Sequence, residues 1–207
     1  MRRLESALGE LVVKSPHPNP LLAWFGRRAI RREARIYDRL SGVDGVPRSF
    51  GLAGTRHLVL EHVPGSTLRE ASPELADRER FFARLLDSIL AMHAAGVAHG
   101  DLKRKENTLV GPGESPFIID FGVACLLEPN ARGPGRLRFE LTRQMDLNAY
   151  IKLKYGARYD GMTPVDAALH KPLLIERIAR RARAPWQFLT LRRARKRRRA
   201  RQSTDRD

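Results

Sequence analysis

Four polar residues with the chemistry of phosphoryl transfer occur close together in the chain. Asp101 and Lys103 belong to the segment His-Gly-Asp-Leu-Lys at positions 99 to 103, and Asn107 and Asp120 follow it. A carboxylate can orient a hydroxyl and receive its proton, an ammonium can screen a transferring phosphoryl group, and carboxylate and amide oxygens bind Mg²⁺. These residue types in this order predict a phosphotransferase whose cofactors are ATP and Mg²⁺.

These residues indicate a phosphotransferase only when they are taken together. Asp and Gly pair constantly in turns, so His-Gly-Asp at 99 to 101 or Asp-Phe-Gly at 120 to 122 would mean little alone. Asn107 and Asp120 are 13 residues apart, which leaves room for two short strands and a turn between them. A helix, a polar loop, this hairpin and the second aspartate therefore follow one another in a consistent order.

Strands and one helix are expected to precede these residues. Three prolines make residues 15 to 20 a loop, because proline cannot donate to a strand ladder. Ile30, Ala34 and Tyr37 recur at spacings of four and three, which predicts a helix with arginines on its other faces. The expected elements are a strand at 10 to 14, a helix at 22 to 40 and a hairpin with strands at 48 to 52 and 57 to 61.

Helices are expected to dominate the remainder. Apolar residues from 81 to 92 carry the strongest helical periodicity in the chain, and Asp77 or a neighbour is placed to cap that helix. Asp146 falls inside another helical pattern. Further expected elements are short strands at 108 to 110 and 117 to 120 around a turn at 111 to 116, a loop at 132 to 136, and helices at 141 to 153, from 163, and at 172 to 183. The fold class is therefore α+β.

The order of these segments resembles the protein-kinase superfamily over residues 12 to 153, and most of all its small atypical members. Those are the RIO kinases, the small kinase of the tRNA-threonylcarbamoylation complex and the lipopolysaccharide-core sugar kinases. The resemblance implies a shortened bilobal fold with a small N-terminal antiparallel sheet plus one helix and a mainly helical C-terminal lobe. It divides the chain into an N-terminal lobe at 1–62 and a catalytic lobe at 63–190. Residues 191–207 are expected to be a disordered basic tail, because a run of basic residues cannot bury enough apolar surface to offset the entropy of ordering.

The resemblance also implies an ATP site in the first lobe. Lys14 would hold the α- and β-phosphates and Glu33, 19 residues later, would pair with it. Leu60 would lie behind the adenine, and the Glu61 carbonyl and Val63 amide would bond its edge. Each residue has a plainer interpretation, as a solvated charge or as part of an edge strand that ends at a proline.

Roles for the second lobe follow from the same resemblance. Asp101 would orient the acceptor hydroxyl, Lys103 would screen the phosphoryl group, and Asn107 and Asp120 would hold Mg²⁺. Four residues would support them: His99 as a brace, Phe121 packed under the site, Gly122 in the turn, and Asp146 holding the catalytic loop or merely solvated.

Three departures from the family pattern limit the comparison. No Gly-x-Gly-x-x-Gly loop precedes Lys14, so the grip on ATP is expected to be weak. Asn107 lies six residues after Asp101 instead of five, so either Arg104-Lys105 bulges or Glu106 takes the metal position. No Ala-Pro-Glu follows the Asp-Phe-Gly motif, which argues against a long phosphorylatable activation segment. A catalytically weak pseudokinase scaffold therefore remains an alternative to the enzyme.

Charge and composition bear on partners and location. The net charge is +16, and residues 192 to 201 hold eight basic residues in ten. That tail predicts contact with an anionic membrane surface or RNA, or simply a solubilising end. A single cysteine and the lack of an apolar run long enough to span a bilayer favour the cytoplasm, with peripheral association at the inner membrane face as an option. The acceptor is expected to be a protein hydroxyl, as in Ser/Thr protein kinases, with a lipopolysaccharide-core sugar hydroxyl as the alternative.

Overall fold

The computed structural model describes residues 2–6, 9–16, 20–54, 56–72, 74–156, 159 and 161–171. The predicted helix at 172 to 183 and the basic tail lie outside these residues. The fold is α+β, as predicted, with small antiparallel sheets and a mainly helical second part, and it is compatible with a shortened protein-kinase-like fold. The predicted boundaries of the lobes and the tail stay predictions.

The first part contains a four-stranded antiparallel sheet. Its strands are β1 (Arg2–Ser6), β2 (Gly9–Lys14), β3 (Ser49–Ala53) and β4 (His57–Glu61), in the order β1-β2-β4-β3. The last three match the predicted strands to within a residue or so, and β1 was not predicted. The register of β2 against β4 places Val12 opposite Leu60, and both side chains are buried.

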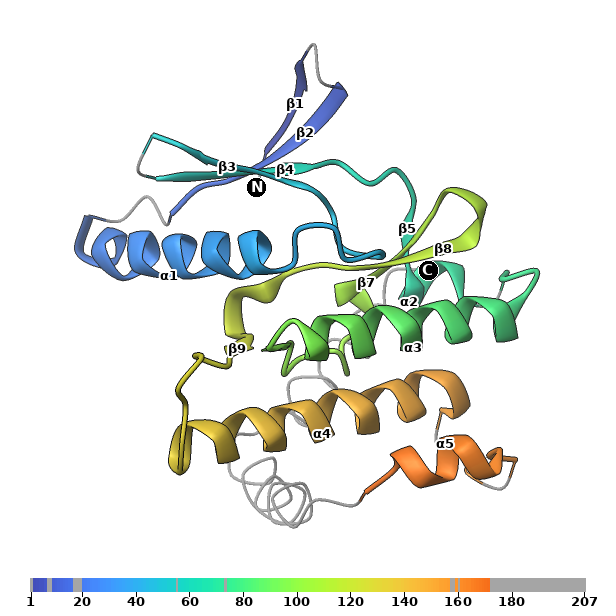
Figure 1. Ribbon diagram of the computed structural model, residues 1–207. Coiled ribbons are helices and arrows are strands. Elements are labelled where there is room, and N and C mark those ends of the chain that lie inside the picture. The colour runs from blue at the N-terminus through green and yellow to red at the C-terminus, as the bar shows by residue number, and fades with distance from the viewer. Residues whose placement is uncertain are drawn as a thin grey trace, which may run out of the picture. The chain divides into compact units, whose positions relative to one another are not determined.

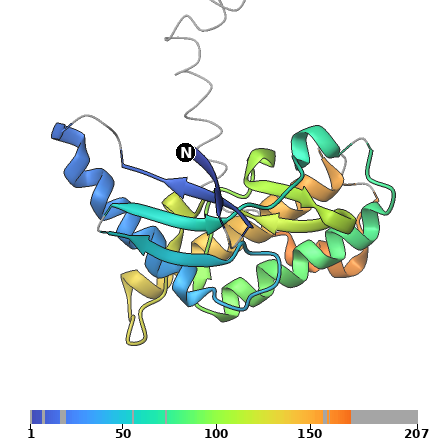
Figure 2. The ribbon, with the colours of Figure 1, turned by 90° about the horizontal axis from the view of Figure 1, so that it is seen from above.

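One long helix, α1 (Pro20–Arg39), lies below this sheet (Figure 1). It starts two residues before the predicted start at 22 and ends one residue before the predicted end at 40. The predicted spacing is confirmed, because Ile30, Ala34 and Tyr37 are buried. Seen from above, the strands of the sheet cross over α1 and the β7–β8 hairpin lies over the green helix α3 (Figure 2). Helix α1 thus contacts both the sheet and, at the turn Phe121–Val123, the second part of the chain.

The second part consists of helices with short strands between them. Its elements are β5 (Ser66–Thr67), α2 (Leu68–Ala71), α3 (Arg78–Ala94), β6 (Val97–Ala98), β7 (Thr108–Gly111), β8 (Ser115–Ile118), β9 (Cys125–Leu126), α4 (Pro134–Tyr155) and α5 (Pro164–Leu169). Short 3-10 turns cover Lys105–Asn107, Pro112–Glu114 and Phe121–Val123. The strands pair as β5-β7-β8 and β6-β9.

Helix α3 forms the centre of the core, as its periodicity predicts. Asp77 is the N-cap, and its side chain accepts a hydrogen bond from the Arg80 amide at 2.9 Å. Phe81, Leu85 and Ile89 are almost fully buried along one stripe of the helix. Burying each such side chain contributes about 1.5–3 kcal/mol to stability, so this stripe is a main source of folding energy.

Three predicted boundaries were wrong. The turn expected at 111 to 116 is shorter, because Gly111 ends β7 and Ser115 begins β8. The loop expected at 132 to 136 contains the start of α4, because Pro134 occupies a first-turn position where its missing N–H costs nothing. The strand expected at 117 to 120 ends at Ile118, and Asp120 adopts left-handed backbone angles (φ 68°, ψ 69°) that no strand allows. The helix expected from 163 is present as α5, with the Thr163 hydroxyl accepting from the Asp166 amide.

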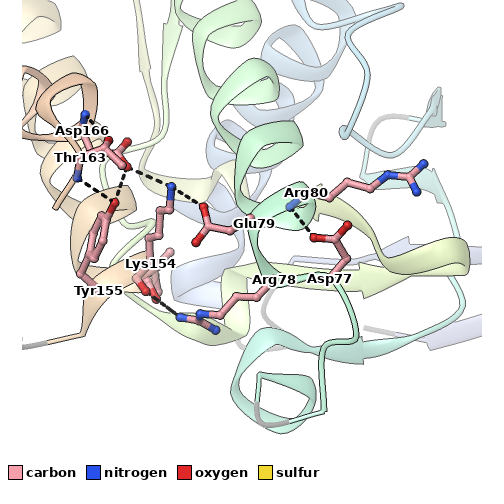
Figure 3. A network of polar contacts seen from close by, with 9 residues as sticks. Asp77, Arg78, Glu79, Arg80, Lys154, Tyr155, Thr163 and Asp166 are labelled. Carbon is pink, nitrogen blue, oxygen red and sulfur yellow. Dashed lines mark hydrogen bonds and ion pairs between the residues drawn. The ribbon is translucent and has the colours of Figure 1, made fainter. Parts of the chain in front are cut away.

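A polar network fastens the ends of three helices in this part (Figure 3). Lys154 near the end of α4 lies 2.9 Å from the Asp166 carboxylate on α5 and 3.0 Å from the Glu79 carboxylate on α3. Arg78 donates to the carbonyls of Leu153 and Lys154, which belong to the last turn of α4, where carbonyls have no partner within the helix. Within the part of the chain that the structure describes, no helix is both long and apolar enough to cross a membrane.

Candidate active site

Three of the predicted site residues meet at the end of β2. The Lys14 ammonium lies 2.6 Å from the Glu33 carboxylate of α1 and 3.0 Å from the Asp120 carboxylate. Lys14 and Glu33 are largely buried, whereas the Asp120 side chain is 56% exposed. The ammonium is therefore fixed between a carboxylate from the helix and one that faces solvent.

The electrostatics of this group favour its charged forms. Burial opposes the charge on Lys14, but the carboxylates of Glu33 and Asp120 outweigh it and raise the lysine pKa. Burial likewise opposes ionisation of Asp120, yet the charge and hydrogen bond of Lys14 hold its pKa below the usual range. An ionised, half-exposed carboxylate of this kind is a suitable oxygen ligand for a divalent cation.

The backbone around Asp120 is held in an unusual conformation by its neighbours. A left-handed conformation at a non-glycine residue costs roughly 1–2 kcal/mol. Phe121, expected under the site, is fully buried between the rings of Tyr37 and His99, each with its centroid 5.1 Å away. Gly122 lies in the following 3-10 turn, and the positive φ of this segment belongs to Asp120.

Arg32 adds a second restraint to the same segment. Its guanidinium donates to the carbonyl of Gly122 at 3.2 Å and to the carbonyl of Ala124. Arg32 precedes Glu33 on α1, so one helix both pairs with the lysine and fixes the chain after Asp120. The sequence analysis did not identify Arg32, because it stands among five other arginines of the same helix.

Asp146 holds the loop that carries the predicted base. One carboxylate oxygen accepts from the His99 amide at 2.7 Å and the other from the Gly100 amide at 2.8 Å. The first oxygen also lies 3.1 Å from the His93 ring. Asp146 is fully buried, so of the two interpretations left open, the structure favours the loop contact over a solvated residue.

His99 links this loop to the segment before Asp120. Its Nε2 atom lies 2.9 Å from the Ile119 carbonyl, and its Nδ1 atom accepts from the Asp101 amide at 3.2 Å. With both ring nitrogens engaged and the side chain fully buried, His99 has the contacts of the expected brace. It has no free atom with which to act as a base.

Asp101 is partly exposed and lies among positive charges. Its carboxylate is 3.7 Å from the Lys103 ammonium and 3.8 Å from the Arg104 guanidinium, distances of weak ion pairs. The carboxylate keeps 19% of its surface exposed, so a hydroxyl can reach it. Lys103 is half exposed and faces the same solvent region.

The extra residue between Asp101 and Asn107 is absorbed by a turn. The Arg104 amide donates to the Asp101 carbonyl, the Asn107 amide donates to the Arg104 carbonyl, and residues Lys105–Asn107 form a 3-10 turn. Asn107 is therefore still buried beside the loop, with its side-chain nitrogen donating to the Asp101 carbonyl at 3.1 Å. The Oδ1 atom of Asn107 is thus the one that a cation can use.

Glu106 points elsewhere. Its carboxylate lies 2.6 Å from the Arg69 guanidinium on α2, and this hydrogen bond together with a backbone one lowers its pKa. Asn107 also lies next to the Asp120 segment, because its carbonyl accepts from the Ile119 amide at 3.0 Å. The donor set of Asn107 and Asp120 fits Mg²⁺, whereas Glu106 is engaged by Arg69.

A pocket of about 440 Å³ lies next to these residues, within the size range of small-molecule sites. Its apolar walls come from β2, β4 and β7, and Ile119 connects it to Asp120. The structure gives the Val63 amide no hydrogen-bond partner among the described residues. Leu60, Glu61 and Val63, the three residues predicted to contact adenine, all line this pocket. The complete lining is Val12, Pro47, Leu60, Glu61, His62, Val63, Gly65, Ser66, Thr67, Glu70, Leu109 and Ile119.

A larger hollow, of about 1000 Å³, lies behind the α1–β3 connection. Of the predicted site residues only Glu61 lines it, and that side chain accepts a hydrogen bond from the Arg48 amide. The smaller pocket adjoins Lys14 through Val12 and Asp120 through Ile119, so it is the one beside the group of Lys14, Glu33 and Asp120.

The sequence analysis missed three further residues that support the site. Tyr37 packs against Phe121, and burial together with the nearby Glu33 and Asp120 charges raises the pKa of its hydroxyl. His93 contacts Asp146, and Arg69 holds Glu106. Tyr37 lies one helical turn after Glu33, which is a signal that the sequence offered; His93 and Arg69 gave none.

With this geometry in place, the chain can be compared with known proteins. No protein-family model matches the chain. It is 40% identical over 85 residues to the putative cyclin-dependent kinase F-2 of Oryza sativa subsp. japonica, which covers 37% of this chain and 26% of that protein. It is 33% identical over 112 residues to the maternal embryonic leucine zipper kinase of Danio rerio, covering 51% of this chain and 16% of the relative.

A similar bacterial protein is also a protein kinase. The serine/threonine-protein kinase PknE of Mycobacterium tuberculosis is 34% identical over 105 residues, which is 47% of this chain and 18% of that kinase. The chain thus spans about a quarter or less of the length of these relatives. Together they support a protein-kinase-like superfamily and a kinase at a coarse level, and they do not single out the small atypical kinases.

Proposed function

We propose that this chain is an ATP- and Mg²⁺-dependent phosphotransferase that moves the γ-phosphoryl group to a serine or threonine hydroxyl of a protein. The observation that carries the proposal is the group of Lys14, Glu33 and Asp120 beside the 440 Å³ pocket. The names of the relatives, which are protein kinases, favour a protein acceptor.

In this proposal the first part binds the nucleotide. Leu60 would border the adenine, and the Glu61 carbonyl and Val63 amide would bond its edge. Lys14 would contact the α- and β-phosphates and is kept charged and directed by Glu33, which lies 2.6 Å away. A buried, paired lysine loses little freedom on binding, so it is already arranged for this contact.

The second part would position the acceptor. Asp101 would orient the hydroxyl and accept its proton, and Lys103 would screen the charge on the phosphoryl group. Asn107 and Asp120 would hold Mg²⁺, which when bound neutralises phosphate charge. Asp146 and His99 would keep the loop and the Asp120 segment at a fixed separation through their backbone contacts.

Turnover of ATP by the purified chain tests the proposal. Wild type with Mg²⁺ and ATP is expected to release ADP and label serine or threonine in an acceptor protein, with activity abolished by EDTA. Asp101→Asn is expected to lower turnover at least 100-fold, as loss of a positioned acid–base group does. Asp38→Asn is the matched control, because Asp38 is an exposed aspartate of α1 with no part in the proposed chemistry.

A pseudokinase scaffold is the second candidate, and one observation favours it. The sequence before Lys14 holds a single glycine, Gly9, where kinases have a glycine-rich loop. If wild type shows no turnover but its melting temperature rises with Mg²⁺ and ATP, and Asp120→Asn abolishes that rise, the chain is a nucleotide-binding scaffold. Labelling of lipopolysaccharide-core sugar instead of protein would replace the proposed acceptor. If the chain shows neither ATP turnover nor a rise in melting temperature with Mg²⁺ and ATP, both functions are rejected.

A further inference from the structure

A third hollow, which is strongly basic, lies on the other side of α1 from Glu33. Its volume is about 670 Å³, and it runs between α1 and the edge strand β3. Its lining residues are Arg27, Arg28, Arg31, Arg32, Ala34, Arg35, Asp38, Gly51 and Leu52. We call these residues the arginine groove.

The charge of the arginine groove is not neutralised by neighbouring side chains. Helix α1 carries six arginines and two acidic residues, and one of the acids, Glu33, is already paired with Lys14. Among the residues that the structure describes, Arg27, Arg28, Arg31 and Arg35 form no ion pair, and Asp38 is the one carboxylate in the lining. Arginines left unpaired side by side repel one another, which an anionic ligand would relieve.

The spacing of these arginines is regular. Arg27, Arg31 and Arg35 follow one another by four residues, which is a rise of about 6 Å along an α-helix for each step. Arg28 and Arg32 form a parallel row next to them. Successive phosphates of an extended nucleic-acid strand are separated by a comparable distance, and a guanidinium can bond a phosphate with two parallel N–H groups.

We propose that the arginine groove binds the phosphodiester backbone of a single-stranded nucleic acid. Each charge of such a strand is part of its backbone, so consecutive phosphates can face the arginine rows while the bases face solvent. An extended acidic peptide places successive side chains on opposite sides, so only every second carboxylate could face α1. A bilayer is flat and cannot enter a groove between a helix and a strand.

The lining also indicates how selective the binding is. Among the lining residues that the structure describes, none is aromatic and could stack on a base, and the one exposed apolar residue is Leu52. Recognition therefore rests on the backbone and is independent of base sequence, with a strong dependence on salt. This inference does not depend on the proposed phosphotransfer, since none of the tested arginines below belongs to the catalytic group.

Binding of a fluorescent single-stranded RNA to the full chain, followed by anisotropy across a salt series, tests the proposal. The groove variant Arg28→Gln, Arg31→Gln, Arg35→Gln changes exposed residues and leaves Arg32, which supports Gly122, in place. Loss of three phosphate contacts is expected to reduce the slope of log K against log salt by about 2. The melting temperature is expected to stay unchanged, which excludes misfolding.

The matched control removes the same charge elsewhere. Arg80, Arg132 and Arg136 are exposed and lie outside the groove, so Arg80→Gln, Arg132→Gln, Arg136→Gln is expected to leave the slope within error of wild type. Equal effects of the two triple variants would overturn the proposal, because binding would then follow total charge. A groove variant that binds as tightly as wild type would overturn it as well.

Cross-linking separates the groove from the basic tail. RNA containing 4-thiouridine is irradiated with the full chain, which is then digested with a protease that does not cleave at arginine. Cross-links on α1 or β3 support the proposal, and cross-links confined to residues 192 to 201 overturn it. Displacement by polyglutamate at a lower charge concentration than by unlabelled RNA would assign the groove to an acidic protein segment. Binding through the same arginines to phosphatidylserine vesicles, without RNA binding, would assign it to membranes.

Discussion

The Lys14 ammonium and the Asp120 carboxylate lie 3.0 Å apart although 106 positions separate them in the chain. The contact joins the last residue of β2 to the segment after β8, so it connects the sheet of the first part to the loops of the second. Glu33 completes the group from α1 at 2.6 Å from the same ammonium. Three separate elements must therefore fold correctly before this charge arrangement exists.

The first prediction concerns Glu33→Gln, which removes the charge that directs Lys14 but keeps an oxygen that can accept its hydrogen bond. Because a hydrogen bond between charged groups contributes about 1.5–3 kcal/mol, kcat/KM for ATP is expected to fall about 10- to 100-fold. Steady-state kinetics measures this effect. Asp38→Asn, an exposed neighbour on the same helix, is expected to leave kcat/KM unchanged; an equal loss in both variants would mean that the net charge of α1 matters and the pair does not.

The second prediction concerns Asp146→Ala, which strips two backbone amides and the His93 ring of their buried acceptor. Each unsatisfied buried donor costs about 1–3 kcal/mol, so the free energy of unfolding is expected to fall by about 3 kcal/mol or more. Asp146→Asn keeps one acceptor oxygen and is expected to lose less. Urea denaturation gives both values. The control is Glu140→Ala, an exposed residue on the same helix; a loss of similar size there would contradict the argument.

Sequence reasoning found the parts of the site that are encoded locally. The strand that ends at Lys14, the helix that carries Glu33 and the capping aspartate at 77 could be predicted, because strand pattern, helix period and cap chemistry all depend on near neighbours. The pairing of Lys14 with Glu33 came from the resemblance to protein kinases. The α+β class followed from the same elements. The two-residue strands β5, β6 and β9 were missed, since two residues show no periodicity and owe their pairing to tertiary contacts.

The features of the site that could not be predicted depend on tertiary contacts. Nothing in the sequence indicates that, of the six arginines of α1, Arg32 is the one that donates to the carbonyls of Gly122 and Ala124. The choice between Glu106 and Asn107 depended on Arg69, which reaches Glu106 from a different element. The positive φ of Asp120 could not be predicted either, because Gly122, two residues later, is the residue that would be expected to adopt it. Such features depend on which chain segments meet in space.

The third prediction compares the two acidic partners of Lys154 (Figure 3). Asp166 is buried, with a side chain 5% exposed, and Glu79 is 76% exposed, although both lie about 3 Å from the same ammonium. Asp166→Asn is expected to lower the free energy of unfolding at neutral pH by about 2 kcal/mol, because it removes the buried carboxylate charge that accepts hydrogen bonds from Lys154 and Tyr155. Glu79→Gln is expected to cost under about 1 kcal/mol. Equal losses in urea denaturation would show that burial does not set the strength of these pairs.

A pH dependence follows from the same carboxylate. Burial alone would raise the pKa of Asp166, but hydrogen bonds from Tyr155 and Lys154 and the lysine charge lower it. The stabilisation is therefore fully present above the unfolded pKa of about 4 and is lost as the pH falls through the lower folded value. On acidification below about pH 4, wild type is expected to lose stability more steeply than Asp166→Asn. Parallel curves of melting temperature against pH would refute this assignment.

The last prediction concerns two glycines that share a positive φ but differ in the space around them. Gly65 has φ 146° and lines the 440 Å³ pocket, and a Cβ there would overlap the Val110 carbonyl oxygen. Gly113 has φ 62° and no atom within 4 Å of such a Cβ. Gly113→Ala is expected to cost about 1 kcal/mol from backbone strain alone. Gly65→Ala must in addition displace β7 or the segment after β4, so it is expected to cost at least twice as much and to raise KM for ATP. Thermal melts and ATP kinetics of the two variants measure the difference, and matching values would show that the pocket wall tolerates the displacement.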